Sequence, residues 1–154
     1  MRYEALYVQL RAMPDPQQRF MACVDHARQR PWLPDPLKTP VNRVEGCQVR
    51  IWFVARLLEN GRCEFLLDSD AVTLKAVAGL LCELYSGALP EEVVANPPLF
   101  VDDLRLTQSL AENRRRTVER IAEGIQSFAR QHTVEAKVTA MQGGVSNPNS
   151  AASP

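Results

Sequence analysis

Apolar side chains recur every three or four residues in four stretches of the chain, which is the periodicity of one face of an α-helix. The stretches are residues 3–10, 16–28, 71–85 and 113–131. The last stretch is the most regular, and its apolar positions are Val118, Ile121, Ile125 and Phe128. We expect a helix in each stretch, with a strand as the alternative for the short first one.

Capping residues and prolines mark where these helices begin. Asp15-Pro16 combines an N-cap with a proline at the first helical position. Ser69 or Asp70 is expected to cap the third helix. Two further short helices, each begun by a proline, are expected at 90–95 and 98–104.

Between the second and third helices the pattern changes to short β-rich runs. We expect three strands, at 42–46, 49–58 and 62–68. Asn60-Gly61 predicts a two-residue type I′ turn between the last two strands, in a register that sets Asp70 opposite Ile51. Residues 31–41 contain four prolines, so this segment is expected to be an extended loop.

The order of these elements sets the fold class. A run of strands between helical segments favours an α+β domain over alternating βαβ units. We predict a two-layer α+β domain over residues 1–132, in which a three-stranded antiparallel sheet is covered by helices. After His132 the apolar periodicity fades and helix-breaking residues follow, so residues 133–154 are expected to form a disordered tail.

Composition narrows the function classes. The chain has 154 residues, of which 45% are hydrophobic, enough for one domain with a core. Its 18 basic residues balance 18 acidic ones, which argues against nucleic acid and anionic membranes as partners. No apolar run is long enough to span a bilayer, and the N-terminus lacks the apolar core of a signal peptide. We therefore expect a cytoplasmic protein.

The four cysteines are expected to be free thiols without a zinc site, because disulfides are rare in the cytoplasm and no C-x-x-C pair is present. Cys23 and Cys82 lie in helical patterns and are expected in the core. Cys47 instead follows Gly46 at the start of a strand, where a thiol can be presented at a turn as a nucleophile; the alternative is a small buried side chain. Cys63 is expected at the other end of the hairpin, roughly 30 Å away at about 3.3 Å per residue, too far for a disulfide with Cys47.

Several other side chains could act beside Cys47. Asp70, at the same end of the hairpin, serves either as a helix N-cap alone or also orients the segment around Cys47. Arg114 begins a run of three arginines in the first turn of the last helix, where the helix dipole disfavours cations. This run is either a solvated basic turn or is offset by a carboxylate such as Asp70 or by an acidic patch on a partner. His26 and Trp52 are expected to pack in the structure, with a base and a lid over the thiol as their alternative roles.

Several motifs around Cys47 resemble the SufE family of sulfur-acceptor proteins, and they follow one another in the same order as in that family. The central motif is Asn42-x-Val44-x-Gly46-Cys47-x-x-x-Ile51-Trp52. The later ones are Asp68-Ser69-Asp70-Ala71, Lys75, Leu84-Tyr85-Ser86-Gly87, Pro90, Leu106-Thr107-Gln108-Ser109-Leu110 and Arg114. The resemblance covers about residues 15–131, and its specificity comes from the ordered combination of motifs.

The resemblance implies a SufE/NifU-like fold and a role in iron–sulfur cluster assembly. In that family, a SufS-like, pyridoxal-phosphate-dependent cysteine desulfurase transfers sulfane sulfur to an acceptor thiol, and the sulfur passes on to a SufBCD-like scaffold. By position, Cys47 is the persulfide acceptor here, and Gly46, Asp70 and Arg114 support it. The protein is then an accessory sulfur-transfer protein that stimulates the desulfurase and holds no cofactor or metal of its own. A homodimer is left open.

The chain also departs from the family pattern, at Val49, where the family has serine, and in segments 26–30 and 115–117. These departures keep an alternative function open, that of a partner or regulator of a cysteine desulfurase that carries no sulfur. A scaffold that assembles an iron–sulfur cluster would need several cysteines at one site, whereas only Cys47 is predicted there. A thiol hydrolase would need a histidine and a carboxylate arranged around the thiol, which the sequence does not indicate.

Overall fold

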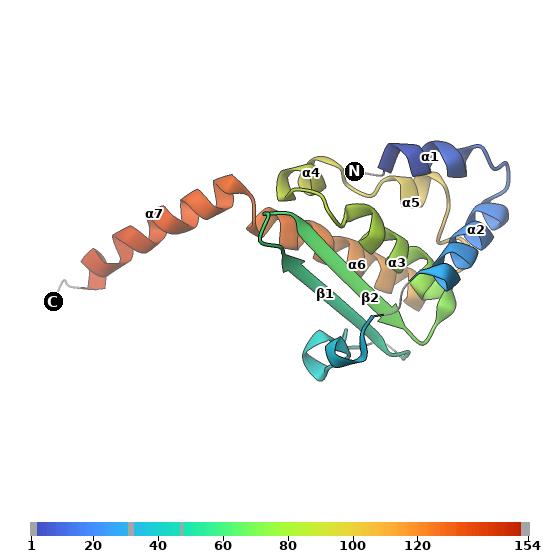
Figure 1. Ribbon diagram of the computed structural model, residues 1–154, viewed down its shortest axis with the longest axis horizontal. Coiled ribbons are helices and arrows are strands. Elements are labelled where there is room, and N and C mark those ends of the chain that lie inside the picture. Colours follow the sequence, from blue (N-terminus) through green and yellow to red (C-terminus); the bar gives the residue numbers. More distant parts are fainter. Residues whose placement is uncertain (1–2, 31–32, 47, 152–154) are drawn as a thin grey trace.

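The computed structural model describes residues 3–30, 33–46 and 48–151 (Figure 1). Cys47 therefore lies outside the described residues. The elements, in chain order, are α1 (Tyr3–Arg11), α2 (Pro16–Gln29), the 3₁₀ turns η1 (Asp35–Leu37) and η2 (Pro40–Asn42), β1 (Ile51–Leu57), β2 (Cys63–Ser69), α3 (Val72–Tyr85), α4 (Pro90–Ala95), α5 (Phe100–Asp103), α6 (Glu112–Gln131) and α7 (Val134–Ala151).

The helices lie close to where the apolar periodicity predicts them. The bounds of α1, α2, α3 and α6 agree with the four predicted stretches to within one residue. Asp15 caps α2, because its carboxylate accepts a hydrogen bond from the N–H of Gln17 at 3.0 Å. The predicted cap of α3 at Ser69 or Asp70 is wrong, because Ala71 occupies the N-cap position. The Ala71 N–H donates to the Ser69 hydroxyl at 3.1 Å.

β1 and β2 form an antiparallel hairpin whose register differs by one residue from the prediction. Ile51 pairs with Ser69 rather than with the predicted partner Asp70. The turn is a three-residue loop, flanked by Leu58 and Arg62, in which the Leu58 N–H donates to the Arg62 carbonyl oxygen at 2.8 Å. Gly61 has a φ of +80°, the left-handed residue that three-residue hairpin loops require. The prediction of a two-residue turn is therefore wrong, although Gly61 from that prediction is the left-handed residue of the observed loop.

Burial explains why this register forms. The predicted register would set Phe53 opposite Asp68, an apolar ring against a carboxylate. The observed register sets Phe53 opposite Leu67 and Ala55 opposite Phe65, and all four contribute to the core or pack against it. Because directly opposed residues share a face of the sheet, the observed pairing collects apolar side chains on the face that the helices cover.

The third strand predicted at 42–46 is not found among the described residues, whose sheet has two strands. This segment makes one isolated antiparallel bridge, between Arg43 and Trp52. Gly46 then takes a φ of +80°, a left-handed conformation that does not continue a strand. The α+β class is confirmed, and the sheet is corrected to a two-stranded antiparallel hairpin covered by helices.

The central helix of the core is α3, which packs on α2, α6 and β2. Leu74, Val77 and Leu81 from its apolar stripe are at most 1% exposed. In Figure 1, α3 and α6 lie behind the hairpin, and α3 begins beside the hairpin end where Ser69 lies. The N-terminus of α3 is thereby fixed next to the segment that carries Cys47.

Residues Val134–Ala151 form α7 in the structure, in the segment where the sequence predicts a disordered tail. This helix projects away from the body in Figure 1 and exposes Val134, Val138 and Met141. The predicted domain boundary near residue 132 stays a prediction. None of the described helices is both long enough and apolar enough to cross a membrane.

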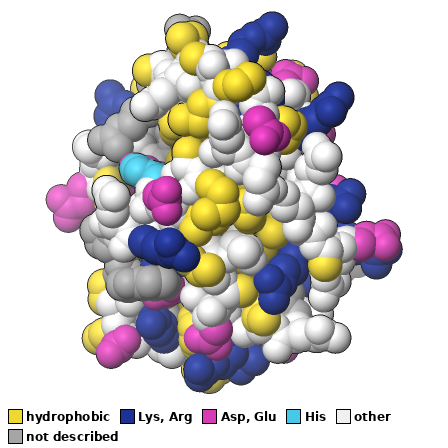
Figure 2. Space-filling model, turned by 90° about the vertical axis from the view of Figure 1, so that its right-hand side faces the viewer, with side chains coloured by type: hydrophobic (Ala, Val, Ile, Leu, Met, Phe, Trp, Pro, Cys, Tyr) yellow, Lys and Arg dark blue, Asp and Glu magenta, His cyan; other side chains and the backbone are white. Residues whose placement is uncertain are grey.

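The surface carries both signs of charge. On the face shown in Figure 2, basic and acidic side chains are interspersed around a central hydrophobic area. This distribution agrees with the formal net charge of zero and gives no field of a single sign over that face.

Candidate functional site

The segment that carries Cys47 enters β1 at the open end of the hairpin. We call residues 43–50 the cysteine loop, and Cys47 itself lies outside the described residues. The loop is tied to the end of β2 by a hydrogen bond from the Asp70 N–H to the Arg50 carbonyl oxygen at 3.2 Å. The prediction that Asp70 lies at the same end of the hairpin as this loop is confirmed.

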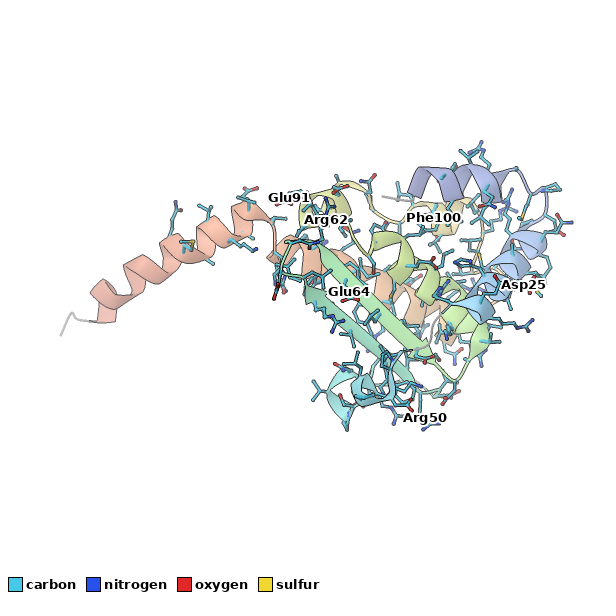
Figure 3. The ribbon with its side chains drawn as sticks, in the orientation of Figure 1. Asp25, Arg50, Arg62, Glu64, Glu91 and Phe100 are labelled. Carbon is cyan, nitrogen blue, oxygen red and sulfur yellow. The ribbon has the colours of Figure 1, made fainter. Side chains whose placement is uncertain are left out.

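The opposite end of the hairpin holds Cys63. Arg50 marks the end with the cysteine loop, and Arg62 marks the turn (Figure 3). Cys63 pairs with Leu57 next to the turn and is 0% exposed. The predicted separation of Cys63 from the cysteine loop is therefore confirmed for the described part of that loop.

A buried carboxylate anchors the open end of the hairpin. Asp68 is 2% exposed and accepts hydrogen bonds from the N–H groups of Leu33, at 3.2 Å, and Ser69, at 2.8 Å. Its oxygens also lie 3.4 Å from Lys75 Nζ and 3.3 Å from Lys38 Nζ. Asp68 thus joins the proline-rich loop to α3.

Lys75 is the other half of this buried pair and is 0% exposed. Burial lowers the pKa of Lys75, and the neighbouring Asp68 carboxylate opposes that shift. Sequence analysis did not identify the pair. Two sequence features pointed to it. Asp68 directly follows the apolar run Phe65–Leu67, and Lys75 lies inside the apolar run Leu74–Val77.

Asp70 makes an exposed ion pair at the edge of the site. Its carboxylate Oδ2 lies 2.7 Å from Arg50 Nε, and both side chains are about half exposed, at 48% and 59%. The Arg50 guanidinium also lies 5.5 Å from the centre of the Trp52 ring. Trp52 is only 9% exposed, which confirms the expectation that it is packed. The Asp70 carboxylate holds a side chain of the cysteine loop, which agrees with a role in orienting it.

Arg114 lies at a small cleft beside the cysteine loop. Its Nη1 donates to the Thr73 hydroxyl at 2.8 Å, which links the first turn of α6 to the first turn of α3. The cleft has a volume of about 200 Å³. Its lining is mostly polar and consists of Gly46, Gln48, Val49, Leu74, Asn113, Arg114 and Thr117. The structure thus brings Arg114 and Gly46 together, as two of the predicted supporting residues.

The neighbours of Arg114 turn to other partners. Arg115 Nε donates to the Leu110 carbonyl oxygen at 3.3 Å, and Arg116 pairs with Glu112 one turn earlier, at 2.7 Å. Because Asp70 pairs with Arg50, it is not the carboxylate that offsets this run. Glu112 compensates part of the charge instead.

Arg120 is a contact that sequence analysis missed. Its Nη1 donates to the Glu45 carbonyl oxygen at 2.8 Å, across 75 positions of the chain. Arg120 lies on the exposed face of α6, where charged residues are ordinary, so no sequence signal distinguished it. The contact fastens the cysteine loop to α6.

The remaining cysteines are buried free thiols. Burial raises the pKa of Cys23 to about 11 and that of Cys82 to about 12, and it also raises the pKa of Cys63. The expectation that Cys23 and Cys82 lie in the core is confirmed. Because the thiolate is the reactive form, these three cysteines are poor nucleophiles near neutral pH.

His26 is exposed on α2, with 48% of its side chain accessible. Its Nε2 lies 2.7 Å from a carboxylate oxygen of Glu83, in the last turn of α3, so this contact joins the two helices at the surface. Within the described ranges, no group of three or more His, Cys, Asp or Glu residues is placed to hold a metal ion.

Comparison with known proteins places this arrangement in a class. A family model described as "SufE: Fe-S metabolism associated domain" matches residues 4–129. The sulfur acceptor protein CsdE of Escherichia coli strain K12 is 27% identical over 116 residues, which are 75% of this chain and 79% of that protein. The solution structure of a hypothetical protein from Thermus thermophilus has a TM-score of 0.66 and 26% identity, and the match covers 84% of this chain and 93% of that one.

The chain thus combines a two-stranded hairpin covered by helices with a match to a domain associated with iron–sulfur metabolism. Since the family model spans most of the chain, the protein belongs to the SufE family.

Proposed function

We propose that this protein is a sulfur acceptor that works with a cysteine desulfurase in iron–sulfur metabolism, and that Cys47 is its acceptor thiol. The observation that carries the proposal is the contrast among the cysteines. Cys23, Cys63 and Cys82 are buried and have raised pKa values. Gly46, which directly precedes Cys47 in the sequence, has a left-handed conformation and lines a polar cleft. Membership in the SufE family and similarity to a sulfur acceptor support the same assignment.

The proposed reaction is an exchange between sulfur atoms. The Cys47 thiolate attacks the terminal sulfur of a persulfide on the desulfurase, and a new S–S bond forms on Cys47. The S–S bond of the donor breaks, and the desulfurase cysteine leaves as a thiolate. The transferred sulfur arrives with the proton or charge that it carried on the donor, so no external oxidant or reductant is needed.

The neighbouring residues have supporting roles in this proposal. Gly46 provides the left-handed bend that precedes the thiol, Asp70 holds Arg50 in the cysteine loop, and Arg114 supplies a cation at the cleft. A cation close to the reacting sulfur atoms favours the thiolate forms of both the acceptor and the leaving group.

The wider pathway is part of the proposal. By removing the persulfide product, the protein would stimulate the desulfurase, and the sulfur on Cys47 would pass to a SufBCD-like scaffold in the cytoplasm. The protein would bind no cofactor of its own. A homodimer is compatible with this role but carries none of the argument.

The test compares desulfurase activity with wild-type protein and with Cys47→Ser, using a SufS-type desulfurase and free cysteine. The proposal expects wild-type protein to raise the rate of sulfide formation in the presence of a reductant and the variant to have no such effect. If Cys47→Ser stimulates as well as wild type, the protein is a partner or regulator that carries no sulfur. Cys82→Ala, which removes a buried thiol, is the matched control and is expected to stimulate normally.

A further inference from the structure

A guanidinium on α6 fixes the two residues that precede Cys47. Arg120 Nη1 donates to the Glu45 carbonyl oxygen at 2.8 Å. It also lies 3.8 Å from the position that a Cβ on Gly46 would occupy, an ordinary contact distance. The contact therefore reaches the backbone of both residues directly before the proposed acceptor.

The position of Arg120 on α6 separates it from the other arginines. It follows Arg114 by six residues, about 9 Å along the axis of a helix that rises about 1.5 Å per residue. Arg116, one turn before Arg120, already pairs with Glu112. Arg114 borders the cleft, whereas Arg120 bonds to the backbone of the loop at Glu45, so the cysteine loop receives cations from two places on α6.

The chemistry of arginine suits this contact. The guanidinium stays protonated at every physiological pH and presents donors in a fixed plane, so a hydrogen bond to a neutral carbonyl leaves its positive charge in place. Thiolates and persulfide anions are the reacting species in sulfur exchange, and a fixed positive charge attracts them more than it attracts neutral molecules.

We infer that Arg120 is a positioning residue of the sulfur-transfer site, which holds Glu45 and Gly46 against α6 and gives the cysteine loop a selectivity for anionic sulfur donors. This inference rests on the proposed function for its donor, but its charge selectivity can be measured without a desulfurase.

The experiment alkylates Cys47 with two reagents of similar size, neutral iodoacetamide and anionic iodoacetate, at low ionic strength. The rate at Cys47 is followed by peptide mass spectrometry, and the other three cysteines are buried. The ratio of the two rates reports the local charge, because a change in exposure alters both rates alike. We expect Arg120→Gln to lower the iodoacetate-to-iodoacetamide ratio by about threefold to tenfold, because the variant removes one charge that lies against Glu45 and Gly46 in a solvated loop.

Two further variants make the result specific. Arg120→Lys keeps the charge and a donor, so it should retain most of the wild-type ratio. Arg130→Gln removes an arginine that pairs with Glu123 near the far end of the same helix, so it should leave the ratio unchanged. An unchanged ratio in Arg120→Gln, which includes the case in which both rates change by the same factor, would overturn the inference.

A second measurement connects Arg120 to sulfur transfer. With a desulfurase, Arg120→Gln should slow persulfide loading of Cys47 and Arg120→Lys should restore it. If the wild-type protein itself takes no sulfur, the proposed function fails. The charge selectivity is then still tested independently by the ratio of the two alkylation rates. If wild type loads normally and Arg120→Gln loads equally fast, the positioning role fails and the proposed function survives.

Discussion

Asp68 and Lys75 form an ion pair inside the protein, with Asp68 Oδ1 3.4 Å from Lys75 Nζ and the two residues 2% and 0% exposed. The pair joins the end of β2 to the first turn of α3, and Asp68 also accepts the N–H of Leu33. The loop before β1 and the helix behind it therefore share one buried carboxylate.

Loss of that carboxylate should destabilise the fold. We expect Asp68→Asn to lower the free energy of unfolding by about 3–5 kcal/mol, because the Lys75 ammonium would stay buried without its counter-charge. Asp70→Asn is the matched control, since it breaks an exposed pair and should cost less than about 1 kcal/mol. Urea unfolding at neutral pH measures both. Equal effects of the two variants would contradict the buried role of Asp68.

Gly46 and Gly61 have the same φ of +80°, so alanine variants of the two distinguish backbone strain from an effect on function. Gly46→Ala and Gly61→Ala should each lower the free energy of unfolding by about 1–2 kcal/mol, since alanine is disfavoured in the left-handed region. Neither Cβ would meet an atom closer than 3.8 Å, so the cost is conformational. We expect only Gly46→Ala to slow sulfur loading, which mass spectrometry of the persulfide follows. A similar slowing in Gly61→Ala would point to a general loss of stability instead.

Much of the fold follows from local signals. The helices repeat apolar residues over many turns, so their positions could be predicted to within one residue. The hairpin could be predicted from Asn60-Gly61, but not its register, because loop length is decided by which side chains the helices bury. The prediction of a third strand was wrong for a local reason. Gly46 adopts a left-handed conformation that the sequence permits but does not require.

The candidate site, like the fold, could be predicted from the sequence only in part. Sequence motifs pointed to Gly46, Asp70 and Arg114, and the structure places all three around the cysteine loop. The partners of these residues are distant in sequence, so pairing Arg50 with Asp70 and Arg120 with Glu45 needed the packed fold. Charges on an exposed helix face are common, and nothing local set Arg120 apart.

Arg114 should matter for transfer more than for stability. We expect Arg114→Gln to slow sulfur loading by about tenfold, the effect of roughly 1.4 kcal/mol on a transition state that carries negative charge on sulfur. Arg115→Gln is the control, because Arg115 donates to the Leu110 carbonyl oxygen and does not line the cleft. Loading rates for the two variants, measured with the same desulfurase, check the prediction. Equal rates would remove Arg114 from the site.

The buried thiols predict a loss of stability in alkaline solution. The pKa of Cys82 is raised from an ordinary value of 9.0 to about 12, so the native state keeps a proton that the unfolded chain releases. The free energy of unfolding should therefore fall as pH rises above about 9, by up to roughly 1.4 kcal/mol per pH unit for this thiol. Lys75, with a lowered pKa, contributes in the opposite direction below its ordinary value of 10.5.

Comparison of wild type with Cys82→Ala isolates the thiol contribution. Urea unfolding between pH 8 and pH 11, roughly the range in which the unfolded thiol ionises, should give a shallower fall for the variant. Parallel curves for the two proteins would mean that Cys82 ionises equally easily in the folded and unfolded states.

Whether Cys47 carries sulfur is decided by loading it from a cysteine desulfurase. The protein is mixed with a SufS-type cysteine desulfurase and cysteine without reductant, and peptide mass spectrometry follows the addition of one sulfur atom. We expect an adduct on the Cys47 peptide that is lost with reductant and absent in Cys47→Ser, while Cys23, Cys63 and Cys82 stay unmodified. An unmodified Cys47, under conditions in which a known SufE protein becomes loaded by the same desulfurase, would contradict it.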